Sequence, residues 1–201
     1  MEFLVPIALV AFGAYMLNAN LQRRRVALLG SRFQPYQVEK LMEQLTDGYL
    51  RCLDERDATR REQIWRTLDA TEATLADQFR QFAADFSKVD EHQAQVSKLP
   101  LAIPYADKLL PRACFDVRTV FRIHALGIAA VAANRRALSA RDKAFTMSAE
   151  LFLMQHTCHW YCRSKAVASA RLMARHKISY ALVLDSVSPD TRAAYRDVVG
   201  R

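Results

Sequence analysis

The sequence predicts an all-α protein, with one N-terminal transmembrane helix followed by a cytoplasmic antiparallel bundle of long, heptad-like helices. Three observations support this fold class: 31 alanines against five glycines and six prolines, an apolar segment at the start, and apolar residues at seven-residue spacing further on. Alanine favours helices, whereas all-β and dinucleotide-binding folds use glycine at turns and phosphate loops. The length of 201 residues is that of one domain with an appendage.

Residues 1–30 are expected to form a membrane anchor helix. The run from Phe3 to Leu17 is apolar or small throughout, which is short for a membrane span of about 20 residues but within reach if the bilayer thins locally. A cleaved signal peptide carries its positive charge before the apolar run, whereas here Glu2 precedes it. The positive charge follows the run, and these residues are expected to set membrane topology and contact anionic lipid: Arg23, Arg24 and Arg25.

This charge order predicts a single-pass membrane protein with its N-terminus outside and the bulk of the chain in the cytoplasm. Gly30 is a suitable residue to end the anchor helix. Two alternatives stay open, namely a buried N-terminal helix of a soluble fold and an anchor that lies in the membrane plane. The in-plane anchor is disfavoured because residues 3–17 show no polar face.

Residues 31–99 are predicted to form a first, acidic helical hairpin. Its first helix is indicated by apolar residues that recur three and four apart from Val38 to Leu53. Thr59 followed by Glu62 resembles a capping box, which predicts the start of a longer helix that runs on toward Ser97. The seven-residue repeat along that helix consists of Leu68, Leu75, Phe82 and Val89.

Residues 100–111 are predicted to be a linker, because three prolines there interrupt any helix: Pro100, Pro104 and Pro111. Residues 112–201 are predicted to form a second, basic hairpin and a short terminal helix. The second long helix of this hairpin is expected to be capped by Ser139, and its seven-residue repeat continues to Met173.

The end of the chain contains one ambiguous segment and one clear helix start. Residues 178–184 fit either an extension of the preceding helix or a short extended piece. Ser188 followed by Pro189 predicts the start of the terminal helix, because serine caps helices and proline suits their first turn.

The net charge of +8 divides unevenly along the chain. Residues 37–110 carry ten basic and fourteen acidic groups, or −4, whereas residues 111–177 carry twelve basic and three acidic groups, or +9. The two hairpins should therefore attract each other and pack as one bundle. Four arginines are candidates for a basic surface that faces lipid, another protein or nucleic acid: Arg135, Arg136, Arg171 and Arg175. Nucleic acid is the least favoured, since no known binding motif accompanies them.

A cluster of histidines and cysteines is the other candidate site. On a helical hairpin turning near Ala140, one layer would contain His124, His156, Cys158, His159 and Cys162. Such a layer could bind zinc, ligate haem or act as a redox sensor. The alternative is ordinary core packing, which is favoured because the spacing matches no established zinc or haem motif. No cofactor is therefore expected.

The motifs of nucleotide-binding proteins, zinc proteases and serine hydrolases are all missing from the sequence. We therefore expect no enzymatic activity. The leading hypothesis is a membrane-anchored helical scaffold or adaptor that recruits partner proteins, with the lipid bilayer and membrane or cytoplasmic proteins as partners. A heptad face that binds a second copy would make it a homo-oligomer. The alternatives are a metal-, haem- or redox-sensing bundle and a membrane-tethered nucleic-acid-binding protein.

Overall fold

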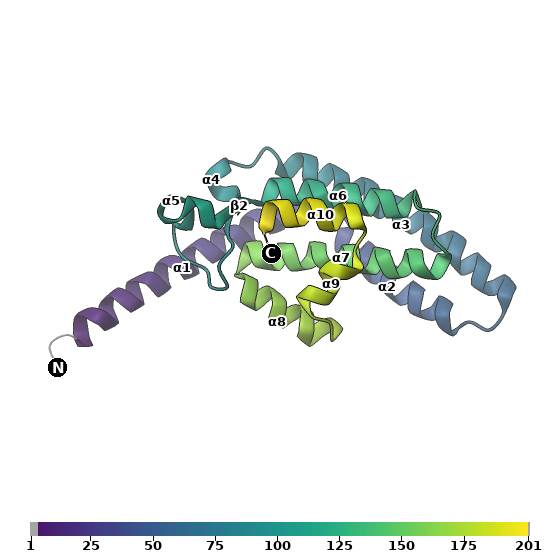
Figure 1. The fold of residues 1–201 in the computed structure, drawn as a ribbon, viewed down its shortest axis with the longest axis horizontal. Helices are drawn as coiled ribbons and strands as arrows, with labels where there is room; N and C mark the ends of the chain where they lie inside the picture. The colour runs from purple at the N-terminus through teal and green to yellow at the C-terminus, as the bar shows by residue number, and fades with distance from the viewer. Residues whose placement is uncertain (1–3, 201) are drawn as a thin grey trace.

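The computed structural model describes residues 4–200, with their side chains except those at positions 4, 5, 8, 10 and 11. This part of the chain is predominantly helical, which confirms the predicted all-α class (Figure 1). The longer helices are α1 (Leu4–Phe33), α2 (Val38–Asp54), α3 (Ala58–Phe86), α6 (Val117–Ala132), α7 (Ala140–Cys162), α8 (Lys165–His176) and α10 (Pro189–Val199). The short elements are α4 (Glu91–Ala94), β1 (Gln95–Ser97), α5 (Ala106–Leu109), the 3-10 helix η1 (Pro111–Ala113), β2 (Cys114–Asp116) and α9 (Tyr180–Ser186).

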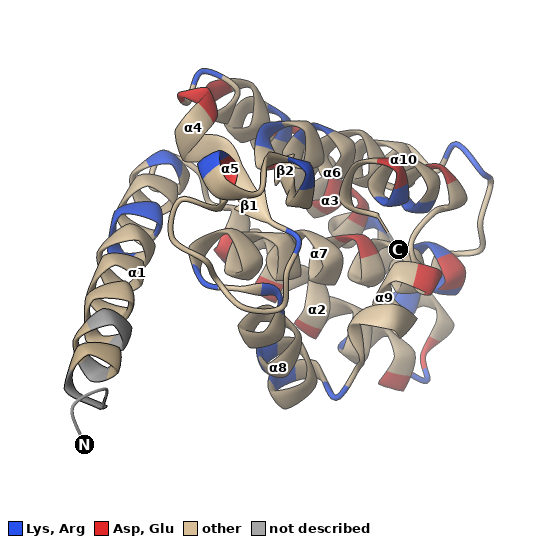
Figure 2. Cartoon of the chain, turned by 60° about the vertical axis from the view of Figure 1, so that its left-hand side comes forward, with Lys and Arg blue, Asp and Glu red and all other residues tan. Residues whose placement is uncertain are grey.

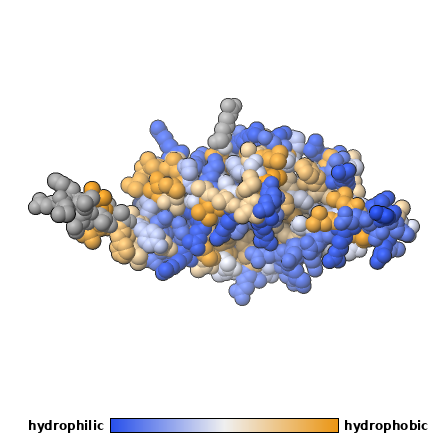
Figure 3. All heavy atoms as spheres, turned by 90° about the horizontal axis from the view of Figure 1, so that it is seen from below, coloured by the Kyte–Doolittle hydropathy of each residue, from blue (hydrophilic) through white to orange (hydrophobic). Residues whose placement is uncertain are grey.

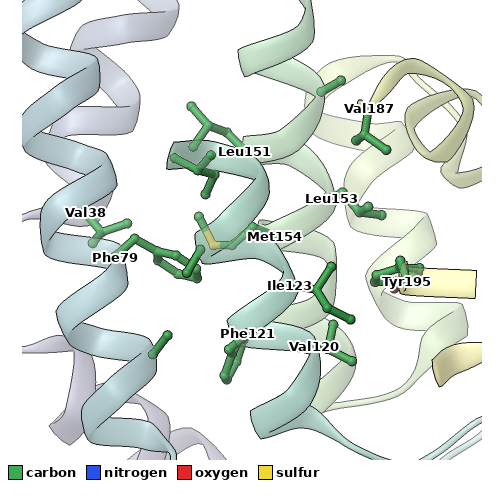
Figure 4. Close-up of a cluster of buried hydrophobic side chains, with 14 of the residues drawn as sticks. Val38, Phe79, Val120, Phe121, Ile123, Leu151, Leu153, Met154, Val187 and Tyr195 are labelled. Atoms are coloured by element: carbon green, nitrogen blue, oxygen red, sulfur yellow. The ribbon is translucent and has the colours of Figure 1, made fainter. Parts of the chain in front are cut away.

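The long helices form one bundle with a single continuous core. Helix α3 packs against α2 and α6, α6 packs against α7, and α10 covers α6 while α8 and α9 cover α7 (Figure 1). The predicted seven-residue repeat faces this core, since Leu68, Leu75 and Phe82 of α3 are buried, and so is Val89, which follows the end of that helix. Figure 4 shows how Phe79 of α3, Phe121 of α6 and Met154 of α7 meet in it.

The prediction of a membrane-spanning N-terminal helix is wrong: no helix in residues 4–200 is both long and apolar enough to cross a membrane. The single-pass topology, with its N-terminus outside and its bulk in the cytoplasm, loses its basis with that helix. Helix α1 differs from an anchor because its second half belongs to the bundle. It continues past Gly30, and its Leu29 is buried. The ring centroid of Phe33 lies 3.9 Å from that of Phe82 in α3. Glu2 and Phe3, which also entered the prediction, lie outside the described residues.

The segment between the two hairpins also departs from the prediction. Helix α3 ends at Phe86 and not near Ser97, and the next long helix begins only at Val117. The intervening chain pairs β1 with β2 as antiparallel strands. Trp160 of α7 holds this pair on the bundle, because its Nε1 donates a 2.9 Å hydrogen bond to the Ser97 carbonyl and its ring packs against Phe115.

The last part of the chain is broken into more helices than its heptad spacing suggests. Helix α7 ends at Cys162 and α8 begins at Lys165, with Ser164 as N-cap, so the repeat that reaches Met173 spans two helices. Most of the ambiguous segment 178–184 is helical, because α9 starts at Tyr180.

Helix caps were predicted with mixed success. Ser139 caps α7 and Ser188 caps α10, each accepting a hydrogen bond from the third residue beyond it. The capping box of Thr59 and Glu62 is wrong, since Asp57 caps α3 by accepting a 2.8 Å hydrogen bond from the Arg60 amide. The Asp57 carboxylate also interacts favourably with the helix dipole. This explains why α3 begins before the predicted cap at Thr59.

The acidic and basic hairpins are joined by a buried ion pair. Lys143 of α7 places its ammonium 2.6 Å from Glu72 and 2.7 Å from Asp69, both on α3. The Tyr49 hydroxyl of α2 donates to the other Glu72 oxygen. The Glu72 side chain is only 2% exposed, so its charge depends on these two partners.

We predict that Lys143→Met lowers the free energy of unfolding by about 3–5 kcal/mol, because it leaves the Glu72 carboxylate buried without a cation. Adding Glu72→Gln should recover much of this loss, since the amide still accepts from Tyr49 and carries no charge. Urea unfolding measures both effects. Lys88→Met, which removes an exposed ion pair with Asp85, is the matched control and should cost under about 1 kcal/mol. Equal losses for Lys143→Met and Lys88→Met would contradict the role of the pair.

Candidate functional site

The five residues of the predicted histidine and cysteine cluster do not come together in one layer. Cys158, His159 and Cys162 line a groove between α7 and the helices α1 and α2, where the His159 Nδ1 is 3.1 Å from Arg171 of α8. His156 does not line this groove and stacks on the Tyr180 ring of α9, at 4.5 Å between centroids. His124 lies on α6, where its Nε2 is 2.9 Å from the Thr157 hydroxyl oxygen.

This separation follows from helix geometry, because positions 156 and 158 on one helix point about 160° apart. Among residues 4–200, no three histidine, cysteine or acidic side chains form a group able to hold a metal ion. Burial raises the pKa of Cys158 well above its ordinary value and that of Cys162 to about 11. Both thiols are therefore protonated at neutral pH, unlike the thiolates of reactive cysteines.

The four candidate arginines line two separate grooves. Arg135 and Arg136 follow α6 and line a groove beside α10, whereas Arg171 and Arg175 belong to α8 and line a groove beside α7. The structure thus places the four arginines in two pairs, each at a different groove.

The arginine triplet of α1 divides in the same way. Arg23 and Arg24 are exposed, but Arg25 turns toward the bundle. Its Nη2 donates a 2.6 Å hydrogen bond to the Gln95 carbonyl and its Nη1 a 3.3 Å bond to the Tyr161 carbonyl, and its guanidinium lies 5.3 Å from the centre of the Tyr161 ring. Sequence reasoning missed this role, although Arg25 lies four residues after Leu21 and four before Leu29, on the face that packs.

Arg25 lines a cavity of about 390 Å³, which we call the Arg25 cavity. Its walls come from the second half of α1, from β1 and the segment 99–108, and from the end of α7. The apolar part of the lining includes Leu21, Leu28, Leu99, Val96 and Trp160. Four cationic side chains line it against one carboxylate, that of Asp107: Arg24, Arg25, Lys108 and Arg163.

Next to this cavity, and sharing Leu101 and Tyr105 with its lining, one end of the molecule exposes large apolar side chains. The first half of α1 projects from the bundle, and the segment that carries α5 lies beside α1 (Figure 1). Figure 3 shows hydrophobic surface on the projecting part of α1 and on the adjoining end of the body. We call this surface the apolar end, and it consists of Ile7, Leu9, Phe12, Tyr15, Met16, Leu17, Leu101, Tyr105, Leu109 and Leu110.

Two histidines give the bundle a predictable pH dependence. Burial lowers the pKa of both His124 and His156 to about 3, and the Nδ1 of each has no hydrogen-bond partner in residues 4–200. The folded state therefore binds fewer protons than the unfolded state between this value and the ordinary pKa of 6.5. Their stabilising contribution is complete above pH 6.5 and is lost as the pH falls below it.

We predict that the free energy of unfolding falls steeply between pH 6.5 and pH 4.5. In His124→Gln the amide can still bond Thr157, so the slope should decrease by up to one proton, or about 1.4 kcal/mol per pH unit. Urea unfolding at a series of pH values measures the slope. An unchanged slope in His124→Gln would show that this histidine is not held neutral by the fold.

No protein-family model, curated protein sequence or solved structure matches the chain. Its function is therefore inferred from its own residues, their packing and their charge.

Proposed function

We propose that the protein is a membrane-surface adaptor, whose apolar end contacts a lipid bilayer while the bundle is left free to hold a partner protein. The observation that supports this function is the set of exposed apolar side chains at one extremity of the molecule. Contact of this kind does not require any helix to span the bilayer.

The shape of the apolar surface on α1 favours lipid over a protein groove. Ile7, Phe12 and Leu17 are exposed by 63%, 62% and 49%, and at about 100° per residue they point in three different directions around the helix. A groove on a protein partner covers one face of a helix, whereas a fluid bilayer surface can adapt to side chains that point in several directions.

The segment 101–110 extends the same surface beyond α1. Leu101 and Leu109 are exposed by 71% and 68%, and with Leu110 and Tyr105 they add to the apolar patch at this end. Tyr105 accompanies them, and tyrosine is enriched where proteins meet the polar boundary of a membrane. Two separate segments of the chain therefore supply apolar side chains at one end.

The charge next to the apolar end complements an anionic lipid surface. Five exposed cationic residues lie on α1, α5, η1 and the residue after α7: Arg23, Arg24, Lys108, Arg112 and Arg163. Figure 2 shows that the blue bands of α1 lie on the part nearer the bundle and that its outer part is tan. Each basic side chain close to anionic headgroups contributes about 1 kcal/mol to binding.

The position of the apolar end supports the second part of the proposal, that the bundle holds a partner protein. The apolar end lies at one extremity of the elongated bundle, so that lipid contact there leaves α2, the α6–α7 turn and α10 uncovered (Figure 1). These elements would present the bundle surface to a protein partner.

We predict that the purified protein floats with vesicles containing anionic phospholipid and that Phe12→Glu binds them at least tenfold more weakly. Leu109→Glu should weaken binding as well, since it adds a charge to the second segment of the apolar end. Leu126→Glu is the matched control, because Leu126 is similarly exposed at 66% but belongs to α6. It should float like the wild-type protein.

Sedimentation in vesicle-free buffer separates lipid contact from self-association. A wild-type protein that forms a stable oligomer, becomes monomeric in Phe12→Glu and does not float would contradict the lipid contact. Equal flotation of Phe12→Glu, Leu109→Glu and Leu126→Glu would contradict it too.

A further inference from the structure

The Arg25 cavity is of a size and composition suited to a small ligand. Small-molecule sites in proteins are typically cavities of about 300–1,000 Å³ with mostly apolar walls and a few polar groups. The Arg25 cavity has about 390 Å³, and its walls combine aliphatic side chains with the Trp160 ring. Its polar groups decide what kind of ligand it can accept.

Arg25 is a partly buried cation that forms no ion pair. Its two hydrogen bonds go to backbone carbonyl oxygens, and no carboxylate in the described residues lies within 4.0 Å of it. Its Nε is buried and has no hydrogen-bond partner in residues 4–200. A buried charge is costly unless an opposite charge accompanies it.

The surroundings of Arg25 offset this charge only in part. Arg24, Lys108 and Arg163 line the same cavity, and its one carboxylate, Asp107, approaches the His92 ring at 3.3 Å. Burial lowers the pKa of Arg25 from its ordinary value, although Tyr161 and Asp107 act in the opposite direction.

A second polar group of the cavity lies on the same helix face. Asn18 also lines the cavity, and its Oδ1 is buried without a partner in the described residues. It precedes Arg25 by seven residues, so the two side chains share one face of α1 about 10.5 Å apart along the axis. Leu21 and Leu28 line the cavity from this face as well.

From these observations we propose that the Arg25 cavity binds a single-chain anionic amphiphile, a molecule with one carboxylate or phosphate group on an aliphatic body. The acid group would accept from the Arg25 guanidinium, and the chain would pack on the leucines and on Trp160. A free fatty acid and a lysophospholipid both have this chemistry. The proposal goes beyond bilayer contact, because it concerns one dissolved molecule in a partly open cavity.

The test is titration calorimetry of the full-length protein in vesicle-free buffer, with decanoate, decanol and a short-chain lysophosphatidic acid as probes. Decanoate should bind at least tenfold more tightly than decanol, since a charge-assisted hydrogen bond is lost with the alcohol. Tighter binding of the lysophosphatidic acid than of decanoate would identify a lipid phosphate as the preferred group, and the reverse would identify a carboxylate. Equal binding of decanoate and decanol, or binding of neither acid, would overturn the proposal.

Variants identify the site. Arg25→Gln should bind decanoate at least tenfold more weakly and decanol unchanged, whereas Arg23→Gln, on an exposed neighbour that does not line the cavity, should bind both like the wild-type protein. A folded Arg25→Gln with wild-type affinity for decanoate would overturn the proposal.

Arg25 also holds α1 on the bundle, so a second variant keeps the test independent of folding. Ala102→Trp fills the cavity from the segment 99–105 with Arg25 intact, and it should lose decanoate binding. Retained binding in Ala102→Trp would contradict the assignment to this cavity. Phe12→Glu should retain it, which separates this site from the proposed bilayer contact.

Discussion

The Arg25 guanidinium joins α1 to two other elements of the bundle, in addition to the apolar packing of Leu29 and Phe33. It bonds one carbonyl oxygen on β1 and one on α7, and it lies over the Tyr161 ring. Through these contacts the second half of α1 is fixed on the bundle, and because a helix is stiff, its first half must project. The position of the apolar end therefore depends on a polar interaction in the interior.

The strand pair is the second constraint at this end. Gln95 and Asp116 face each other at its edge, Val96 and Phe115 are buried, and Trp160 of α7 donates to the Ser97 carbonyl. The chain between the strands therefore forms a compact projection beside α1. A hydrogen bond from the Ala166 amide to the Pro100 carbonyl joins it to the start of α8. The Arg25 cavity lies where α1, this projection and the end of α7 meet.

Local and periodic features of the fold could be predicted from the sequence. Helical periodicity located the buried faces of α2 and α3, and serine at a helix start identified the caps at Ser139 and Ser188, because both signals act within a few residues. The strand pair could not be predicted in this way. It consists of two three-residue segments about twenty residues apart, whose pairing depends on a tryptophan from a third element.

The site was predicted only in part, for a related reason. Charge order along the chain drew attention to the triplet of arginines as residues for topology and lipid contact, and it treated the three as equivalent. In the structure Arg25 is partly buried while Arg23 and Arg24 remain exposed, because the helix continues into the bundle and positions 21, 25 and 29 face inward. The histidine and cysteine cluster failed for a similar reason. His156 and Cys158 are close in sequence, but they lie on different faces of α7.

The central claim is that one end of the molecule, built from α1 and the segment 101–110, contacts lipid. The most direct measurement is quenching by brominated phospholipid of a genetically encoded fluorescent amino acid placed at position 12, 109 or 126. We expect strong quenching at positions 12 and 109 and little at position 126. Equal quenching at all three positions, or none at positions 12 and 109, would contradict the claim.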